Sequence, residues 1–309
     1  VLFESDWLGS TPYFYNQKTG ESSKLINDVI TGDNVLKFHR EGLYNFLDYG
    51  YSVFGQTPLE DVKFLKPASR LIKLQDGRLI EEKLTDPLEK WLNYSLSEGD
   101  IIDLIQERVQ KWESKLSSDQ KIILPLSGGF DSRLLLWCIK DKTRVKAFTY
   151  GFSQNQKKSS EVVYAKKLSE KYKLDWEQIS IGKFHKYFDE WNNIYGLSTH
   201  AHGMYHFEFY EIIRRMLKKE HFFLSGIFGD VFAGNVKKIR IKNADDLIKL
   251  SYSHGLNADP KNLNFHSEKN LRDNFWIENK EELNDERFQI VTTIRIKIIL
   301  ISYLLKIPS

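Results

Sequence analysis

The sequence predicts an α/β protein in two parts, a smaller β-rich region over residues 1–95 and a Rossmann-like domain with a parallel sheet over residues 96–309. In the first part, short aromatic and β-branched runs are separated by glycines and prolines, which is the turn spacing of a small sheet. From residue 121, apolar runs alternate with helical patterns. That rhythm indicates a parallel sheet with helices on both faces. Two adjacent glycines follow the first apolar run, where a strand passes into a helix.

The first part ends in a hairpin and then turns helical. Asp76-Gly77 is a favourable hairpin turn, because residues 70–74 before it and 79–80 after it are suited to strands. At Asp86-Pro87 the pattern changes, since aspartate can cap a helix and proline suits its first turn. Apolar residues at helical spacing then predict a helix over residues 100–116.

The second part continues with strands and helices in alternation. Apolar runs predict strands at residues 121–126, 145–150, 176–181 and 222–225. Helices are predicted over 134–139 and 162–172. Residues 240–290 are polar with a helical tendency. The apolar run over 298–305 is shorter than the roughly 20 residues that a bilayer span needs, so we expect a buried helix there and no membrane span.

Composition narrows the class of protein. A hydrophobic fraction of 41% and a charged fraction of 28% are ordinary for a globular chain. The net charge of +3 is spread along the sequence, so no nucleic acid partner is expected. A single cysteine, Cys138, and no apparent signal peptide favour a cytoplasmic location. The chain begins with Val1 and stops behind an apolar run, so we expect a fragment or an ordered part of a longer chain.

The residues most informative about chemistry are Ser127-Gly128-Gly129-Phe130-Asp131-Ser132. The glycines can adopt positive φ and let backbone N–H groups approach an anion. A helix that begins here adds unpaired N–H groups and a partial positive charge. Ser127 and Ser132 add hydroxyl donors, and Asp131 suits a Mg²⁺ ion that bridges phosphates. A purely steric turn with a helix cap is the alternative, but the complete string in a strand–loop–helix context favours a phosphate site.

This loop resembles the pyrophosphate loop of the asparagine synthetase family, whose synthetase domain cleaves ATP between the α- and β-phosphates. Three further stretches are similar to that family, in the same order. Residues 148–152 are similar to its second strand, whose backbone lies against adenine. Residues 160–165 look like its acid-x-x-Tyr-Ala helix start. Residues 223–235 resemble its Leu-Ser-Gly-Glu-Gly-x-Asp-Glu-Phe-x-Gly-Tyr segment.

The resemblance implies a set of site residues. It implies that ATP is bound by Leu126, Ser127, Gly128, Gly129, Asp131, Ser132, Thr149, Tyr150, Ser225 and Gly226. It also implies that Mg²⁺ is held by Asp131 and Asp230, which are expected to be catalytic. Arg133 is the third catalytic candidate and stands where synthetases usually have a second serine. Its guanidinium could meet a phosphate or a carboxylate, or it could lie exposed on the helix.

Residues 4–15 and 54–69 resemble the family's glutaminase domain, which implies that residues 1–95 are a truncated, glutaminase-like region. The family's glutaminase uses an N-terminal cysteine as its nucleophile. This chain has Val1 there, and Cys138 follows the loop in a predicted helix. We therefore expect Cys138 to be a core residue and the chain not to hydrolyse glutamine.

Two further departures concern the substrate. Ile227 and Val231 stand where the family has glutamates, so aspartate is not the expected substrate. The expected function is an ATP-dependent, AMP- and pyrophosphate-forming amide ligase or amidotransferase. It would act on a small-molecule, sugar-acid or peptide carboxylate, with ammonia or an amine as the donor. The alternative is a non-catalytic nucleotide-binding or scaffold relative.

A histidine cluster between residues 200 and 206 admits three interpretations. His202 and His206 are four residues apart and could share a helix face, as zinc ligands do. No glutamate lies between them in the manner of a zinc protease, and no third ligand is evident. Contact with substrate, a core or solvated position, and metal binding all stay open.

Overall fold

The computed structural model describes residues 1–30, 36–199, 203–217, 221–227, 229, 240–251 and 270–302. The chain divides into two compact units, neither of them continuous in sequence. The first unit comprises Val1–Asn93, Phe188–Gly203 and Val231–Leu304. The second comprises Tyr94–Tyr187, Met204–Asp230 and Leu305–Ser309. Segments late in the sequence therefore pack with the β-rich region, while the division into domains at residue 95 stays a prediction.

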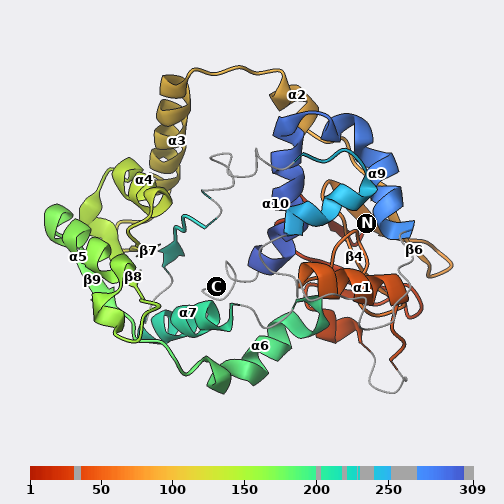
Figure 1. Cartoon of the computed structure of the whole chain (residues 1–309), viewed down its shortest axis with the longest axis horizontal. Helices are drawn as coiled ribbons and strands as arrows, with labels where there is room; N and C mark the ends of the chain where they lie inside the picture. Colours follow the sequence, from red (N-terminus) through yellow and green to blue (C-terminus); the bar gives the residue numbers. More distant parts are fainter. Residues whose placement is uncertain are drawn as a thin grey trace. The chain divides into compact units, whose positions relative to one another are not determined.

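The first unit contains two antiparallel sheets of three strands, in the orders β1-β5-β6 and β3-β2-β4 (Figure 1). The strands are β1 (Phe3–Glu4), β2 (Phe14–Asn16), β3 (Ser22–Ser23), β4 (Val62–Phe64), β5 (Ser69–Lys73) and β6 (Leu79–Lys83). The predicted hairpin is confirmed, since β5 pairs with β6 and Gly77 in the turn has a φ of 86°. Its helices are α1 (Arg40–Tyr49), α2 (Leu88–Leu92), α6 (Phe188–Tyr195), α9 (Asn270–Leu283) and α10 (Glu286–Ser302), with 3-10 turns η1 (Ile26–Val29), η5 (Gly196–Ser198) and η7 (Ala244–Ser251).

Buried polar contacts join the late helices to the early part of this unit. The guanidinium of Arg295 on α10 lies 2.7 Å from the Asp86 carboxylate, and both side chains are largely buried. On α9, the Leu271 N–H donates to the Glu41 carboxylate at 2.7 Å. Removing one partner of such a buried contact is costly, because the other is left without compensation. Pairing between distant residues therefore explains why helices beyond residue 270 pack with the first unit.

The second unit contains a four-stranded parallel sheet in the order β10-β7-β8-β9. The strands are β7 (Ile122–Pro125), β8 (Val145–Thr149), β9 (Asp175–Gln178) and β10 (Phe222–Phe223). Its helices are α3 (Glu98–Glu113), α4 (Phe130–Cys138), α5 (Ser160–Tyr172) and α7 (Met204–Met216), with 3-10 turns η2 (Lys142–Arg144), η3 (Gln156–Lys158) and η4 (Phe184–Tyr187). The α/β class and the parallel sheet predicted from the sequence are confirmed.

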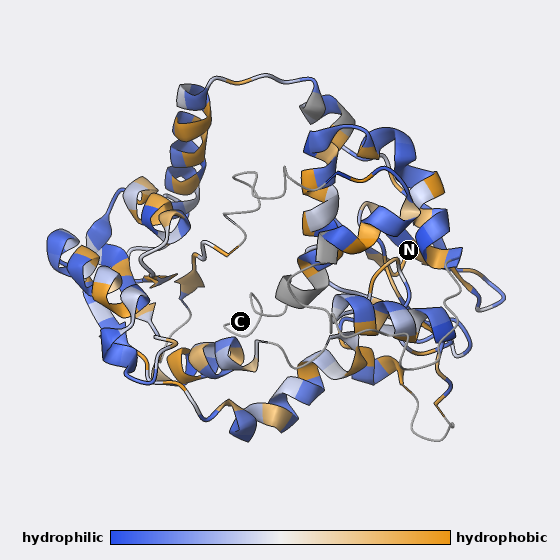
Figure 2. Cartoon of the chain, in the orientation of Figure 1, coloured by the Kyte–Doolittle hydropathy of each residue, from blue (hydrophilic) through white to orange (hydrophobic). Residues whose placement is uncertain are grey.

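One face of this sheet is covered by α3, α4 and α5. Its core consists of Ile122, Leu124, Leu126, Leu136, Ile139, Val145, Ala147 and Ala165, all almost fully buried. Val109 and Trp112 of α3 pack against that core. Apolar and polar residues alternate along α3, as expected of an amphipathic helix that covers a sheet (Figure 2). On α7, Tyr210 packs against Phe223 of β10, with ring centroids 5.8 Å apart.

A buried carboxylate fixes the end of α4. Glu113, the last residue of α3, accepts the N–H groups of Lys140 and Asp141 at 2.7 and 2.9 Å. The backbone of the segment that follows α4 is thereby hydrogen-bonded to the end of α3. Cys138 lies fully buried in the same region, and burial raises the pKa of its thiol. Cys138 is therefore a core residue, as predicted.

In the described part of the chain, no helix has the length and apolar character needed to cross a membrane. The run predicted to be a helix begins inside α10, which is helical as far as Ser302. A cytoplasmic location stays a prediction.

Candidate active site

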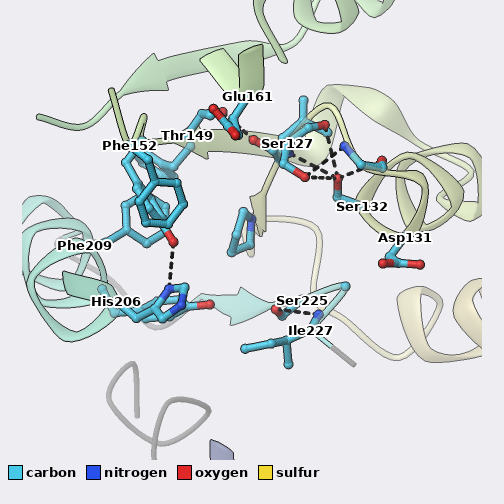
Figure 3. A pocket seen from close by; sticks show the side chains of 17 residues that line it. Ser127, Asp131, Ser132, Thr149, Phe152, Glu161, His206, Phe209, Ser225 and Ile227 are labelled. Atoms are coloured by element: carbon cyan, nitrogen blue, oxygen red, sulfur yellow. Dashed lines mark hydrogen bonds between the residues drawn. The ribbon is translucent and has the colours of Figure 1, made fainter. Parts of the chain in front are cut away.

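A pocket of about 240 Å³ lies where β7, β8 and β10 end, at the carboxyl edge of the parallel sheet (Figure 3). Ligands of open α/β sheets bind at this edge, because strand ends and helix starts meet there. The pocket is lined by Pro125, Leu126, Ser127, Gly129, Asp131, Ser132, Phe148, Thr149, Tyr150, Phe152, Glu161, His206, Phe209, Tyr210, Ser225, Gly226 and Ile227. Segments that lie far apart in sequence, from Pro125 to Ile227, thus converge on one site.

The loop between β7 and α4 is held by its own hydroxyls. The Ser127 N–H donates to Ser132 Oγ at 3.1 Å, and the Gly129 N–H donates to Ser127 Oγ at 3.1 Å. Ser132 is buried, with 5% of its surface exposed. Among the described side chains, none caps the N-terminus of α4. The first N–H groups of this helix are thus left for an anion.

The two glycines do not use the positive φ that glycine permits. Gly129 has a φ of −70°, and Gly128 also lies outside the left-handed region. The approach of their N–H groups to an anion stays a prediction. Gly128 is needed because of a close approach. A Cβ on Gly128 would lie 2.8 Å from the Cβ of Tyr164 on α5 and 2.9 Å from its Cδ2. A glycine here lets the loop pack directly against α5.

Asp131 lies in the first turn of α4 and lines the pocket. Gly229 leaves room for its side chain, because a Cβ on that glycine would lie only 2.5 Å from Asp131 Cβ and closer still to the carboxylate. Within the described ranges, no group of three His, Cys, Asp or Glu side chains could hold a metal ion. One carboxylate fits Mg²⁺, which proteins commonly hold through one or two carboxylates together with substrate phosphates. Asp230 lies outside the described residues.

The hydroxyl of Thr149 joins the ends of two strands. It donates to the Leu126 carbonyl at 2.5 Å and accepts the Trp176 indole N–H at 2.9 Å. Thr149 is 3% exposed. Its side chain is therefore occupied by structural bonds. The Thr149 carbonyl also accepts the Ile179 N–H at 2.8 Å, so the backbone at Tyr150 is the part of this segment that a ligand could contact.

Aromatic side chains of α7 form the opposite side of the pocket. The Tyr150 hydroxyl lies 2.8 Å from His206 Nδ1, and its ring centroid is 4.7 Å from that of Phe209. Tyr210 hydrogen-bonds to Ser225. Burial raises the pKa of both Tyr150 and Tyr210, so these phenols stay protonated.

Glu208 fixes the position of α7. Its buried carboxylate accepts the N–H groups of Gly182 and Lys183 at 2.8 and 2.9 Å. Since Glu208 lies between His206 and Phe209 in sequence, this bond attaches the aromatic side of the pocket to the segment after β9.

Most predicted site residues converge on this pocket. Those that line it are Leu126, Ser127, Gly129, Asp131, Ser132, Thr149, Tyr150, Ser225 and Gly226. Gly128 packs behind them, against Tyr164. Arg133 is not among the lining residues. Its Nε donates to the Gly129 carbonyl at 3.2 Å, and its guanidinium lies 4.3 Å from the ring centre of the exposed Phe130. The roles of all these residues stay predictions.

Ile227 is one of the two residues that depart from the glutamates of the resembled motif, and it lines the pocket. Val231 lies outside the described residues, as do His200 and His202. His206, which belongs to the same histidine cluster, is described and lines the pocket.

Sequence reasoning did not assign Glu161, Phe152 or Phe209 to the site, although all three line the pocket. Glu161 lies in the first turn of α5 and lines the pocket (Figure 3). Its place at a helix start that follows a parallel strand was a usable signal, because such starts lie at the carboxyl edge of the sheet. The aromatic residues gave no comparable signal, since an apolar ring in a helix usually belongs to the core.

Comparison with known proteins gives one family. A family model for asparagine synthase, a PP-loop ATP pyrophosphatase domain, matches residues 103–289, more than half of the chain. No curated protein matches the chain. Among solved structures, an NH3-dependent NAD synthetase from Campylobacter jejuni subsp. jejuni NCTC 11168 is 17% identical, with a TM-score of 0.32 over 67% of this chain and 97% of that chain. The U34-tRNA thiolase NcsA from Methanococcus maripaludis is 15% identical, with a TM-score of 0.33 over 70% of this chain and 86% of that chain.

Proposed function

This chain belongs to the asparagine synthase family, and from that premise we propose that it is an AMP-forming amide ligase. In the proposed reaction a substrate carboxylate attacks the α-phosphate of ATP, and pyrophosphate leaves. Ammonia or another amine then displaces AMP from the acyl adenylate and forms an amide. The observation that carries the proposal is the convergence on one pocket of the β7–α4 loop, the end of β8 and the segment after β10.

The loop suits a pyrophosphate group. Ser127 and Ser132 place two hydroxyls at its centre, and the start of α4 supplies backbone N–H groups. An N-terminal helix end with unpaired donors favours negative charge. We propose that the hydroxyls exchange their mutual hydrogen bonds for bonds to phosphate oxygens. Fixed donors of this kind stabilise the charge that develops on the departing pyrophosphate.

Asp131 is the proposed Mg²⁺ ligand, together with Asp230. The ion would neutralise charge on the phosphates and orient them. The space that Gly229 leaves beside the Asp131 carboxylate supports this role, because a larger residue would displace it.

The nucleotide base is proposed to lie along the backbone at Thr149 and Tyr150. Because the Thr149 hydroxyl is bonded to Leu126 and Trp176, recognition there would depend on main-chain groups. Ser225 and Gly226 would then lie near the rest of the nucleotide. A Cβ on Gly226 would lie 2.9 Å from the Ser132 nitrogen, so a glycine keeps this segment close to the start of α4.

Ile227 constrains the second substrate. An apolar side chain in the pocket offers no ligand for an ammonium group and no base, so we propose a carboxylate other than aspartate, such as a sugar acid or a peptide. The same residue favours a second candidate, a nucleotide-binding relative without ligase activity. Residues 1–95 are proposed to be a glutaminase-like domain, and the proposed nitrogen donor is ammonia or another amine.

ATP–pyrophosphate exchange tests the proposal. The chain is incubated with ATP, Mg²⁺, labelled pyrophosphate and a panel of amino acids, sugar acids and peptides. We expect carboxylate-dependent exchange with at least one compound. Asp131→Asn should reduce it by about 10³-fold, because metal-borne charge stabilisation contributes several kcal/mol.

Asp103→Asn is the matched control, since Asp103 is exposed on α3 and outside the pocket. Nucleotide binding without exchange for any carboxylate would favour the non-catalytic candidate. Exchange that survives in Asp131→Asn would refute the role given to the loop.

A further inference from the structure

Amide formation requires a proton acceptor, which Ile227 does not supply. As the amine nitrogen bonds to the acyl carbon, it must lose a proton. The hydrocarbon side chain of Ile227 lines the pocket where the family has a glutamate, and it accepts no proton. The candidates for this role are the other polar groups that line the same pocket.

Tyr150 and His206 form a hydrogen-bonded pair inside this cavity. The phenol oxygen lies 2.8 Å from His206 Nδ1, and both residues line the pocket. Tyr150 follows β8, whereas His206 belongs to α7. In Figure 3, His206 is drawn on the α7 side of the pocket, apart from Ser127 and Asp131.

We infer that His206 and Tyr150 together are the proton acceptor of the amide-forming step, an inference that rests on the proposed ligase function. The amine lone pair attacks the acyl carbon of the adenylate, and the bond from that carbon to the AMP oxygen breaks. AMP leaves with the electron pair. One amine proton passes to the Tyr150 oxygen as the phenol proton passes to His206 Nδ1, which leaves neutral tyrosine and an imidazolium.

The charge of the pair suits this task. Tyr150 stays protonated because burial raises its pKa, so its hydroxyl is able to donate to Nδ1. A neutral phenol does not repel an anionic carboxylate substrate. After the transfer, the imidazolium attracts the negatively charged AMP that departs. Among the described carboxylates that line the pocket, Asp131 is the proposed Mg²⁺ ligand, and Glu161 would add negative charge to the site.

The competing interpretation is that the hydrogen bond only attaches α7 to the segment after β8. Two substitutions separate the interpretations. Tyr150→Phe removes the hydroxyl and keeps the ring that packs on Phe209. His206→Gln keeps a side chain that can hydrogen-bond but cannot take up a proton. If the pair only positions α7, the glutamine variant should retain most of its activity.

The experiment measures three rates with one carboxylate identified by exchange. These are ATP–pyrophosphate exchange, amide formation with ammonia, and hydroxamate formation with hydroxylamine, which is unprotonated at neutral pH and needs little help from a base. In both variants we expect the ratio of amide formation to exchange to fall about 10²-fold or more, as for a lost general base. The ratio of hydroxamate formation to exchange should change only slightly.

Asp103→Asn is again the control, because the Asp103 side chain is exposed on α3 and outside the pocket. An unchanged ratio of amide to exchange in both variants would overturn the inference and leave the ligase proposal standing. A parallel loss of amide and hydroxamate would do the same, since it indicates a positional role. If the unmodified chain catalyses no exchange with any carboxylate, the proposed function fails and this inference fails with it.

Discussion

The pocket has two contrasting walls. The loop wall, made of Ser127, Gly129, Asp131 and Ser132, consists of hydroxyls, a carboxylate and the start of a helix. The helix wall, made of His206, Phe209 and Tyr210 of α7, is mainly aromatic. The loop wall matches the family's motif, whereas none of the three residues of the helix wall was assigned from that motif.

This contrast indicates that ATP and the carboxylate substrate constrain different residues of the pocket. Every enzyme that cleaves ATP in this way handles the same triphosphate, so its phosphate-binding loop has little freedom to change. Carboxylates and amines differ from one reaction to the next, and side chains that contact them vary accordingly. Changes in the loop wall should therefore impair adenylation with any carboxylate, whereas changes in the helix wall should act on the second substrate or on stability.

Among the variants that alter packing around the two walls, the largest effect is expected from Gly128→Ala. The new Cβ would collide with Tyr164, and the loop would have to shift by several tenths of an ångström or more. Displacements of this size can cost about 10²-fold in rate, so we expect exchange to fall by about that factor.

Gly99→Ala on α3 is its control, because a Cβ there would meet its nearest atom at 3.8 Å. Equal exchange rates in Gly128→Ala and the unmodified chain would mean that the loop does not depend on its packing against α5.

Glu208→Gln should act mainly on stability. The amide NH₂ group would face one of the two N–H donors that the carboxylate now accepts. An unsatisfied buried donor costs about 1–3 kcal/mol. We expect a lower midpoint of thermal unfolding, by about 2–4 °C per kcal/mol in a domain of this size, and a smaller loss of exchange than in Gly128→Ala.

Glu177→Gln, at an exposed carboxylate of β9, serves as the comparison and should leave the midpoint in place. A Glu208→Gln variant as stable as the unmodified chain would show that the helix wall is held by its aromatic contacts alone.

Arg133→Ala should have the smallest effect. Its guanidinium bonds to the carbonyl of its own loop and stacks over the exposed Phe130. Exposed contacts of this type contribute about 0.5–1 kcal/mol, so exchange should fall by no more than a few-fold. A loss as large as that of Gly128→Ala would instead place this side chain on a phosphate or a carboxylate when substrates bind.

The sequence predicted the parts of the molecule that depend on local patterns. Alternating apolar runs gave the four parallel strands, and Asp76-Gly77 gave the hairpin. The loop was identified because its string of residue types is unusual and because the strand before it and the helix after it are adjacent in the chain. Each of these features is set by residues close together in the chain.

What could not be predicted depends on contacts between distant residues. Gly229 makes room for Asp131, which is 98 positions earlier, and no local pattern announces that contact. The same applies to the ion pair between Arg295 and Asp86, which joins α10 to the early part of the first unit. His206 was a candidate among several because its partner, Tyr150, lies on another element. Positive φ was considered for Gly128 and Gly129, yet neither adopts it, and the constraint on Gly128 is its contact with Tyr164 of α5.

The most direct test is a crystal structure of the chain with Mg²⁺ and an ATP analogue that cannot be cleaved between its α- and β-phosphates. We expect the β- and γ-phosphates against Ser127, Ser132 and the first N–H groups of α4, with the ion on Asp131 and the base along Thr149 and Tyr150. Analogue bound elsewhere, while the Ser127–Ser132 hydrogen bond persists at saturating concentration, would contradict the nucleotide site proposed here.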